Sequence, residues 1–217
     1  MIFFAADDHY GSNPGKAIYD NIKSDYDILF KENDWSIFTD HDLPEKCSLL
    51  VLNMIADASV MEMPGPDAEK YVKEYCEKGG NLLLLHGSSA AFWHWNWWRP
   101  IVGLRWIRGT DPDGFAASTH PYAPCTIKVC KTRHPLAAQL KKINLPEDEI
   151  YTSMEQTCPV SVVMDTTFEL GTFPQCYETA TPWGGKIVGF IPGHSPAATS
   201  NPELIYNIKT IINYLAA

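Results

Sequence analysis

The sequence predicts an α/β domain in which helices cover both faces of a mostly parallel sheet. Continuous apolar runs, such as residues 48–54 and 82–85, are typical of parallel strands buried on both faces. Helical patterns with start and stop signals lie between these runs, so strands and helices alternate along the N-terminal half. With 217 residues, of which 45% are hydrophobic and 20% charged, the chain can form one well-packed domain over residues 1–217.

Local patterns define the individual elements. A helix begins at Pro14, because Asn13 is a capping residue and proline suits the first helical position. A second helix begins at Pro66 and ends at Gly79-Gly80. The strands expected in the N-terminal half cover residues 2–6, 36–39, 48–54 and 82–85. In the C-terminal half we expect strands over 126–130, 161–165 and 185–191, a closing helix over 202–215, and a loop over 105–122 at the rim of a site.

Composition and charge argue against several classes of function. The formal net charge of −9 argues against a nucleic-acid partner. No apolar run approaches the roughly 20 residues of a membrane-spanning helix, and the N-terminus lacks the basic flank of a signal peptide. We therefore expect a cytoplasmic protein without a membrane partner, whose six cysteines are reduced. Tryptophans in residues 92–107 would suit a homo-oligomer if they are exposed, and burial in the core explains them equally well.

Three histidine-bearing segments follow predicted strands. Asp8 and His9 come after the first strand, His86 after the strand over 82–85, and His194 after the strand over 185–191. Ligands of open parallel sheets bind beyond the carboxyl ends of the strands, so these segments should meet at one edge. A lone histidine at a strand end more often has a structural role than a functional one. Three histidines at one edge support a shared functional site about as well as separate structural roles.

Residues 85–92 have the pattern of a strand–turn–helix elbow, which can present backbone N–H groups to a substrate oxygen. A glutaminase of this architecture needs a cysteine at the turn, and none is present. Ser88 and Ser89 are the nearest nucleophiles, although serines at a helix start are usually caps.

Tryptophans and carboxylates supply further candidates. Residues 92–98 carry four tryptophans, which either fill a core or, for one or two of them, line a sugar-sized pocket. Residues 145–151 carry three carboxylates before a predicted strand, which form either a solvated turn or a pair that serves as ligand or general base.

Several short motifs, taken in order, resemble one known family. They are Gly79-Gly80-Asn81 leading into Leu85-His86-Gly87-Ser88, Trp97-Trp98, Ile101-Val102-Gly103, His120-Pro121, His134-Pro135-Leu136, Asp148-Glu149-Ile150-Tyr151, Pro182-Trp183-Gly184-Gly185-Lys186-Ile187-Val188 and Gly193-His194-Ser195. With these motifs the chain resembles the ThuA-like (trehalose-utilisation) family over nearly its whole length.

The resemblance implies a flavodoxin-like fold similar to class I glutamine amidotransferases, with the nucleophilic cysteine lost. It also implies a role in bacterial carbohydrate catabolism, on keto-sugars or keto-glycosides made by partner oxidoreductases. It would place His86, His120, Glu149 and His194 around one pocket.

The leading hypothesis is therefore a lyase, isomerase or hydrolase of oxidised sugars without glutaminase activity. We expect His86, His194 and Glu149 to be catalytic, with Asp8 as an alternative base, and no nucleotide cofactor. His86, His120 and His194 could hold a divalent metal such as Zn, Mn, Co or Ni, which would stabilise an enediolate. The residues expected to bind the small carbohydrate are Asp8, His9, Ser88, Trp93, Trp97, Tyr151 and Trp183. The alternatives are a non-catalytic sugar-binding or regulatory module on a degenerate amidotransferase scaffold, and a hydrolase that uses Ser88 or Ser89.

Overall fold

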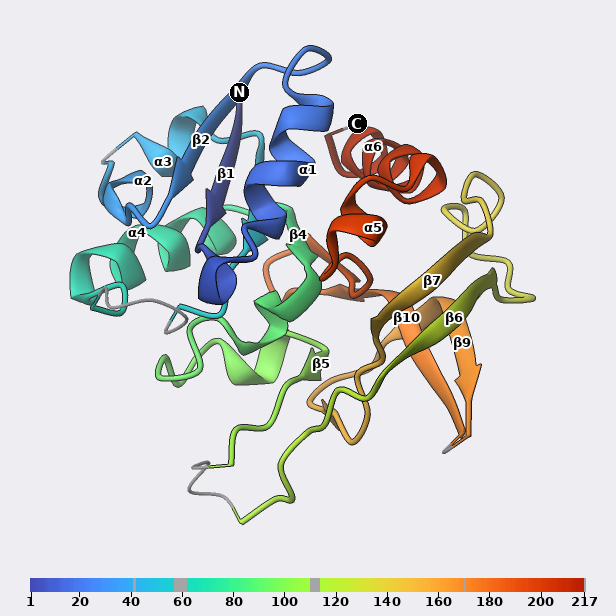
Figure 1. Cartoon of the computed structure of the whole chain (residues 1–217). Helices are drawn as coiled ribbons and strands as arrows, with labels where there is room; N and C mark the ends of the chain where they lie inside the picture. The colour runs from blue at the N-terminus through green and yellow to red at the C-terminus, as the bar shows by residue number, and fades with distance from the viewer. Residues whose placement is uncertain (41, 57–61, 110–113, 170, 217) are drawn as a thin grey trace.

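A nine-stranded sheet forms the centre of the molecule (Figure 1). The computed structural model describes residues 1–40, 42–56, 62–109, 114–169 and 171–216. The parallel half of the sheet has the order β2 (Ile28–Glu32), β1 (Ile2–Ala6), β3 (Leu49–Asn53), β4 (Leu82–Leu85) and β11 (Lys186–Phe190). This 2-1-3-4-5 type of order is that of flavodoxin-like folds. The expected α/β class is therefore confirmed.

The sheet continues beyond β11 as an antiparallel extension. Its strands are β10 (Gly171–Ala180), β9 (Ser161–Phe168), β6 (Tyr122–Val129) and β7 (Ile143–Glu149), in that order. A separate two-stranded sheet pairs β5 (Leu104–Arg105) with β8 (Glu155–Gln156). The segment 145–151, expected to precede a strand, thus lies largely within β7 and continues just past its end.

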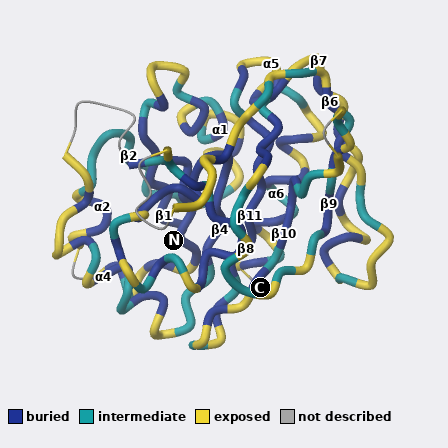
Figure 2. Tube along the Cα trace, turned by 90° about the horizontal axis from the view of Figure 1, so that it is seen from below, coloured by how far each residue is buried: buried dark blue, intermediate teal, exposed yellow. Residues whose placement is uncertain are grey.

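Helices pack on both faces of the parallel half, as Figure 1 shows. The helices are α1 (Pro14–Ile22), α2 (Ser36–Thr39), α3 (Leu43–Lys46), α4 (Pro66–Glu77), α5 (Pro196–Thr199) and α6 (Pro202–Ala216). Successive strand residues point to opposite faces of the sheet. Phe4 belongs to the apolar core with α1 and α6, and Phe3 belongs to the core with α2, α3 and α4. Strands β1, β3 and β4 are buried at every position, because both of their faces are covered (Figure 2).

One predicted strand is wrong, and five strands, β2, β5, β7, β8 and β10, lie where no strand was predicted. Residues 36–39 form helix α2, whose Ile37 and Phe38 are buried against the second core. The strand in this part of the chain is β2, at the edge of the sheet, where every residue is only partly buried. Its last two residues, Lys31 and Glu32, are charged, so β2 lacks the continuous apolar run by which the central strands were recognised.

Two general expectations can be compared with the structure. All six cysteines are free thiols. Among the described residues, no helix combines the length and the apolar character needed to cross a lipid bilayer.

Candidate functional site

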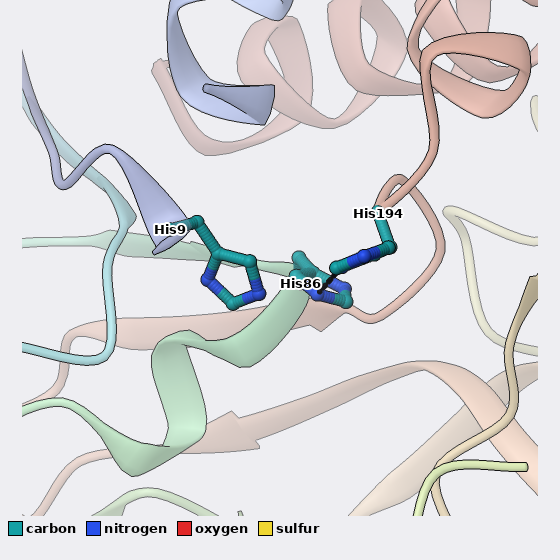
Figure 3. Close-up of side chains that lie close together, drawn as sticks. All are labelled: His9, His86 and His194. Atoms are coloured by element: carbon teal, nitrogen blue, oxygen red, sulfur yellow. Dashed lines mark hydrogen bonds between the residues drawn. The ribbon is translucent and has the colours of Figure 1, made fainter. Parts of the chain in front are cut away.

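Three histidines meet beyond the carboxyl ends of strands in the parallel half of the sheet. His9 follows β1, His86 follows β4 and His194 follows β11. One possible ligand atom from each histidine lies within 4.8 Å of the other two, and the three side chains gather in Figure 3. The expected convergence of these loops is thus confirmed. This group contains His9 where the sequence-based metal set had His120.

His86 is the most buried member of this histidine cluster, which we define as His9, His86 and His194. Its Nδ1 lies 3.0 Å from the carbonyl oxygen of Ile191, so Nδ1 carries the proton and donates it. The lone pair of Nε2 then points toward Tyr151 Oη at 3.1 Å and His194 Nδ1 at 3.2 Å. Burial lowers the pKa of His86 well below its ordinary value, which keeps the ring neutral and able to bind a metal.

The backbone is strained at two members of the cluster. His9 and His86 have φ angles of 45° and 50°, and Tyr10, next to His9, has 57°. This left-handed region is unfavourable for residues other than glycine and persists only where surrounding structure enforces it. Here β4 passes directly into a 3₁₀ helix over His86–Ala90, where the sequence predicted a strand–turn–helix elbow.

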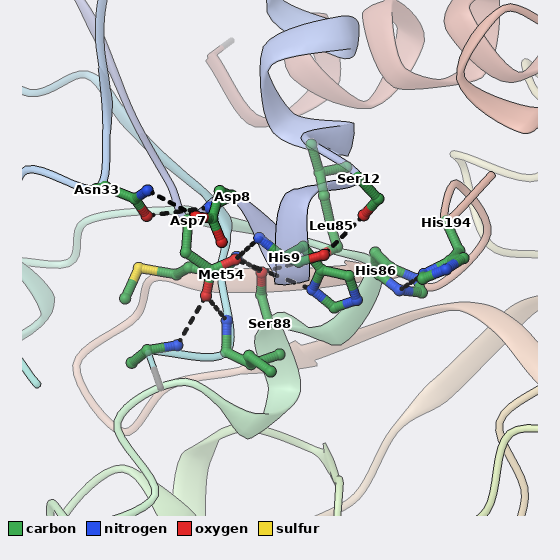
Figure 4. A network of polar contacts seen from close by, with 12 residues as sticks. Asp7, Asp8, His9, Ser12, Asn33, Met54, Leu85, His86, Ser88 and His194 are labelled. Carbon is green, nitrogen blue, oxygen red and sulfur yellow. Dashed lines mark hydrogen bonds and ion pairs between the residues drawn. The ribbon is translucent and has the colours of Figure 1, made fainter. Parts of the chain in front are cut away.

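Two buried aspartates hold the loops that carry the outer histidines. Asp148 accepts backbone N–H bonds from Gly193, His194 and Ser195, at 2.7, 3.0 and 3.3 Å. Asp7 accepts N–H bonds from His9, Ile55 and Ala56, at 3.2, 2.7 and 3.0 Å. Figure 4 shows the network around Asp7. These bonds link the end of β1 to the loop after β3, and β7 to the loop after β11.

Burial disfavours the charged form of both aspartates. It raises the pKa of Asp7 to about 6 and also raises the pKa of Asp148, while the backbone N–H bonds act in the opposite direction.

Glu149 connects the histidine cluster to the protein surface. Its Oε2 lies 3.5 Å from His86 Nε2, and its Oε1 lies 3.6 Å from His194 Nδ1. The same Oε1 lies 3.0 Å from Nδ1 of His120, whose side chain is half exposed. Burial raises the pKa of Glu149, partly offset by the neighbouring histidines. The structure therefore places His120 beside Glu149 on the side of the site that faces solvent.

A cavity of about 210 Å³ opens onto these groups. It is lined by His9, Tyr10, Ile55, Gly87, Ala90, Trp106, Arg108, His120, Glu149, Tyr151 and His194. Gly87 keeps this space open, because a Cβ atom there would lie 2.7 Å from Ile55 Cγ2 and 3.3 Å from Tyr151 Oη. The cavity thus combines imidazole, carboxylate and phenol groups with apolar walls, a composition that suits a small polar ligand.

The sequence matches the family described as ThuA, trehalose utilisation, over residues 5–215. The chain belongs to the ThuA family. No match was found among curated proteins.

Solved structures with a similar fold include one protein of nearly the same size. A ThuA-like protein from Parabacteroides merdae is 17% identical, with a TM-score of 0.76, and the alignment covers 100% of this chain and 90% of that one. β-Galactosidases from Rahnella sp. R3 and Bacillus circulans sp. alkalophilus are 8% and 13% identical, each with a TM-score of 0.55. The match covers 99% and 97% of this chain but 31% of either β-galactosidase. At these identities the likeness concerns the fold alone.

Two of the expected carbohydrate-binding residues have structural contacts in this ThuA-family chain. Ser88 Oγ donates to the carbonyl of Leu85 at 2.7 Å and accepts the N–H of Met54 at 2.9 Å. Ser88 is fully buried and lies outside the cavity lining, so neither sugar binding nor a nucleophilic role follows from its position. Asp8 pairs with the side chain of Asn33 and also lies outside the cavity lining.

The three expected tryptophans also lie outside the cavity lining formed by the described residues. Trp183 precedes β11, at the end of the strand opposite to His194. Trp97 donates its indole N–H to Glu69 on α4. Trp93 is partly exposed beneath the Arg108 guanidinium, 5.3 Å from its ring centre. The segment after the elbow, which carries Trp93 and Trp97, forms turns.

Sequence reasoning missed six residues that line the cavity, and three of them, Tyr10, Trp106 and Arg108, have large aromatic or charged side chains. Trp106 lies 4.5 Å from the Tyr151 ring and 5.6 Å from the His120 ring, between ring centres. The available signal was the predicted rim loop over 105–122, which contains Trp106 and Arg108. Tyr10 follows His9 directly, and nothing in the sequence distinguished it from an ordinary turn residue.

Acid should destabilise this ThuA-family chain through His9. Burial, aided by the nearby His194, lowers the pKa of His9 to about 4 from an ordinary value of 6.5. Between these values the unfolded chain binds more protons, so the free energy of unfolding falls as the pH falls. From pH 7 to pH 5, the free energy of unfolding of His9→Gln should therefore fall by about 2 kcal/mol less than that of the wild type. Urea unfolding of metal-free protein at both pH values measures this difference, and an unchanged difference would contradict it.

Proposed function

We propose that this protein is an enzyme of carbohydrate catabolism that acts on a keto-sugar or keto-glycoside with a divalent metal. The description of its family, trehalose utilisation, supports a carbohydrate as the substrate. The observation that carries the proposal is the histidine cluster, whose ligand atoms lie within 4.8 Å of one another. We infer a cytoplasmic enzyme whose partner is a small carbohydrate.

The histidine cluster has the donor chemistry of a transition-metal site. Neutral imidazoles suit Zn, Mn, Co or Ni, and burial keeps His9 and His86 neutral at pH 7. Three histidines with Glu149 beside them leave positions for substrate oxygens. When bound, such a metal would act as a Lewis acid on a ketone oxygen.

Glu149 is our candidate for the general base. A ketone acidifies the neighbouring C–H bond, and Glu149 would accept that proton while the electron pair moves onto the ketone oxygen. Burial raises the pKa of Glu149, which makes this carboxylate a stronger base than an exposed one. His120, paired with Glu149 and half exposed, would pass the proton to solvent. The resulting enediolate can take up a proton at the other carbon, which is an isomerisation, or expel the glycosidic oxygen, which leaves as an alcohol with a proton from solvent, and addition of water to the eliminated product completes a hydrolysis.

The second candidate is a non-catalytic sugar-binding module. It is favoured by the cysteines, since none of the six lies among the residues that line the described cavity. Burial also raises the pKa of Cys47 to about 11 and of Cys125 to about 12, so these thiols are poor nucleophiles. A hydrolase based on Ser88 is disfavoured by the two hydrogen bonds that occupy its hydroxyl.

Metal analysis tests the proposal most directly. Untagged protein is dialysed without chelator, incubated separately with Zn, Mn, Co and Ni, and analysed by plasma mass spectrometry. We expect one divalent metal per chain and metal-dependent conversion of keto-glycosides. Binding of sugar without conversion at any metal would favour the non-catalytic module, and absence of both metal and sugar binding would refute both candidates.

A further inference from the structure

Two strongly exposed tyrosines lie beside the histidine cluster. Tyr10 has 73% of its surface exposed, more than any other large apolar side chain of the described residues, and Tyr122 has 48%. The Tyr10 ring centre is 5.7 Å from that of His9, and the Tyr122 ring centre is 6.2 Å from that of His194. Each of the two outer histidines therefore has an exposed aromatic ring next to it. Tyr10 lines the cavity, while Tyr122 lies outside its lining, next to His194.

The backbone fixes both tyrosines relative to the site. Tyr10 belongs to the turn that carries His9, where the carbonyl of Asp8 accepts the N–H groups of Gly11 and Asn13, both at 2.9 Å. Tyr122 begins β6 and pairs in register with Glu149 on β7. The backbone of Tyr10 thus belongs to the turn of His9, and that of Tyr122 belongs to the strand paired with the strand of Glu149.

The size of the cavity limits what can enter it. Its volume of about 210 Å³ lies below the roughly 300–1,000 Å³ of pockets that enclose drug-sized ligands. A single sugar ring fits this space, while a disaccharide has to extend beyond it. Any second ring of a glycoside bound at the histidine cluster therefore lies at the mouth, where Tyr10 is exposed.

We propose that Tyr10 and Tyr122 form a second subsite, which binds the outer sugar ring of a glycoside whose reacting ring occupies the cavity. The C–H-rich face of a pyranose is apolar and stacks on aromatic rings, which tolerate the exposed hydroxyl groups around it. The subsite rests on the proposed function, because it assumes that the cavity takes a sugar. With this subsite, the protein binds a disaccharide-like glycoside in preference to a free monosaccharide.

Binding measurements on two ligands test this subsite. The ligands are a methyl 3-keto-glucoside and the disaccharide with the same keto-glucosyl ring, titrated calorimetrically into metal-loaded protein. We expect the wild type to bind the disaccharide about tenfold more tightly, because stacking on aromatic rings adds affinity that a methyl group cannot supply. In Tyr10→Ser/Tyr122→Ser this ratio should fall to about twofold or less, because the disaccharide loses more affinity than the methyl glucoside when the two rings are removed.

Tyr206→Ser is the matched control, since Tyr206 is also exposed, at 41%, and lies on α6 away from the cavity. It should retain the wild-type ratio. Equal affinities for the two ligands in the wild type, or an unchanged ratio in the double variant, would overturn the subsite while leaving the proposed function in place. Absence of binding by both ligands would overturn the subsite and the proposed function together.

Discussion

Replacement of His86 by alanine should abolish metal binding and turnover while the protein remains folded. His86 Nε2 lies at the centre of the site, close to Tyr151, His194 and Glu149. Mutation of groups that only support metal ligands reduces metal affinity or activity by about 10–100-fold, so loss of a ligand should cost at least about 100-fold. The same result is expected for His194→Ala. Metal content and turnover are measured together, with circular dichroism to verify the fold.

His94→Ala is the matched control for this experiment. His94 bonds the carbonyl of Pro64 through Nε2 at 3.2 Å and lies outside the cavity lining. It should keep both metal and activity. Full metal content and activity in His86→Ala and His194→Ala would refute the assignment of the histidine cluster.

Asp148→Ala should have the largest effect on stability, a loss of about 3 kcal/mol or more in the free energy of unfolding. The carboxylate accepts three backbone N–H groups around His194, and its removal leaves these donors buried without partners. Because the same bonds position His194, affinity for Zn should fall as well. Urea unfolding at pH 7 gives the first quantity, and chelator competition gives the second.

Two further variants define what the carboxylate contributes. Asp148→Asn keeps one acceptor oxygen and should recover part of the stability and of the Zn affinity. Asp34→Ala removes an aspartate that accepts a backbone N–H from Ser36 at 3.0 Å on the surface, and should lose about 1 kcal/mol or less. A loss of this small size in Asp148→Ala would show that the loop of His194 is held by other contacts.

Strands β1, β3, β4 and β11 could be predicted from the sequence because their residues are apolar at nearly every position. The edge strands β2 and β7 could not be predicted, and neither could β10, which contains Pro174. β2 is only partly buried, and β7 alternates buried and exposed residues around Pro146 and Glu147, which resemble a turn. Whether such a segment forms a strand depends more on its tertiary contacts than on its local sequence pattern.

The same difference between central strands and the rest of the chain explains which residues of the candidate site could be predicted from the sequence. His9, His86 and His194 could be predicted to meet because each follows a central strand, and the ends of such strands share one edge. The tryptophans could not be placed, because their positions depend on turns after His86 whose geometry the sequence did not specify. The aspartate contacts were likewise unpredictable, since Asp148 meets residues more than forty positions away.

The junction at β11 has a consequence for folding. β11 pairs with β4 on its parallel side and with β10 on its antiparallel side, and the site draws His86 from the first half and Glu149 and Tyr151 from the second. His86 is 108 residues from His194 and 65 from Tyr151 along the chain. Contacts of such long range form only when both halves have assembled, so the site should mature late in folding. A ligand that binds there should raise the melting temperature of the whole sheet as one cooperative unit.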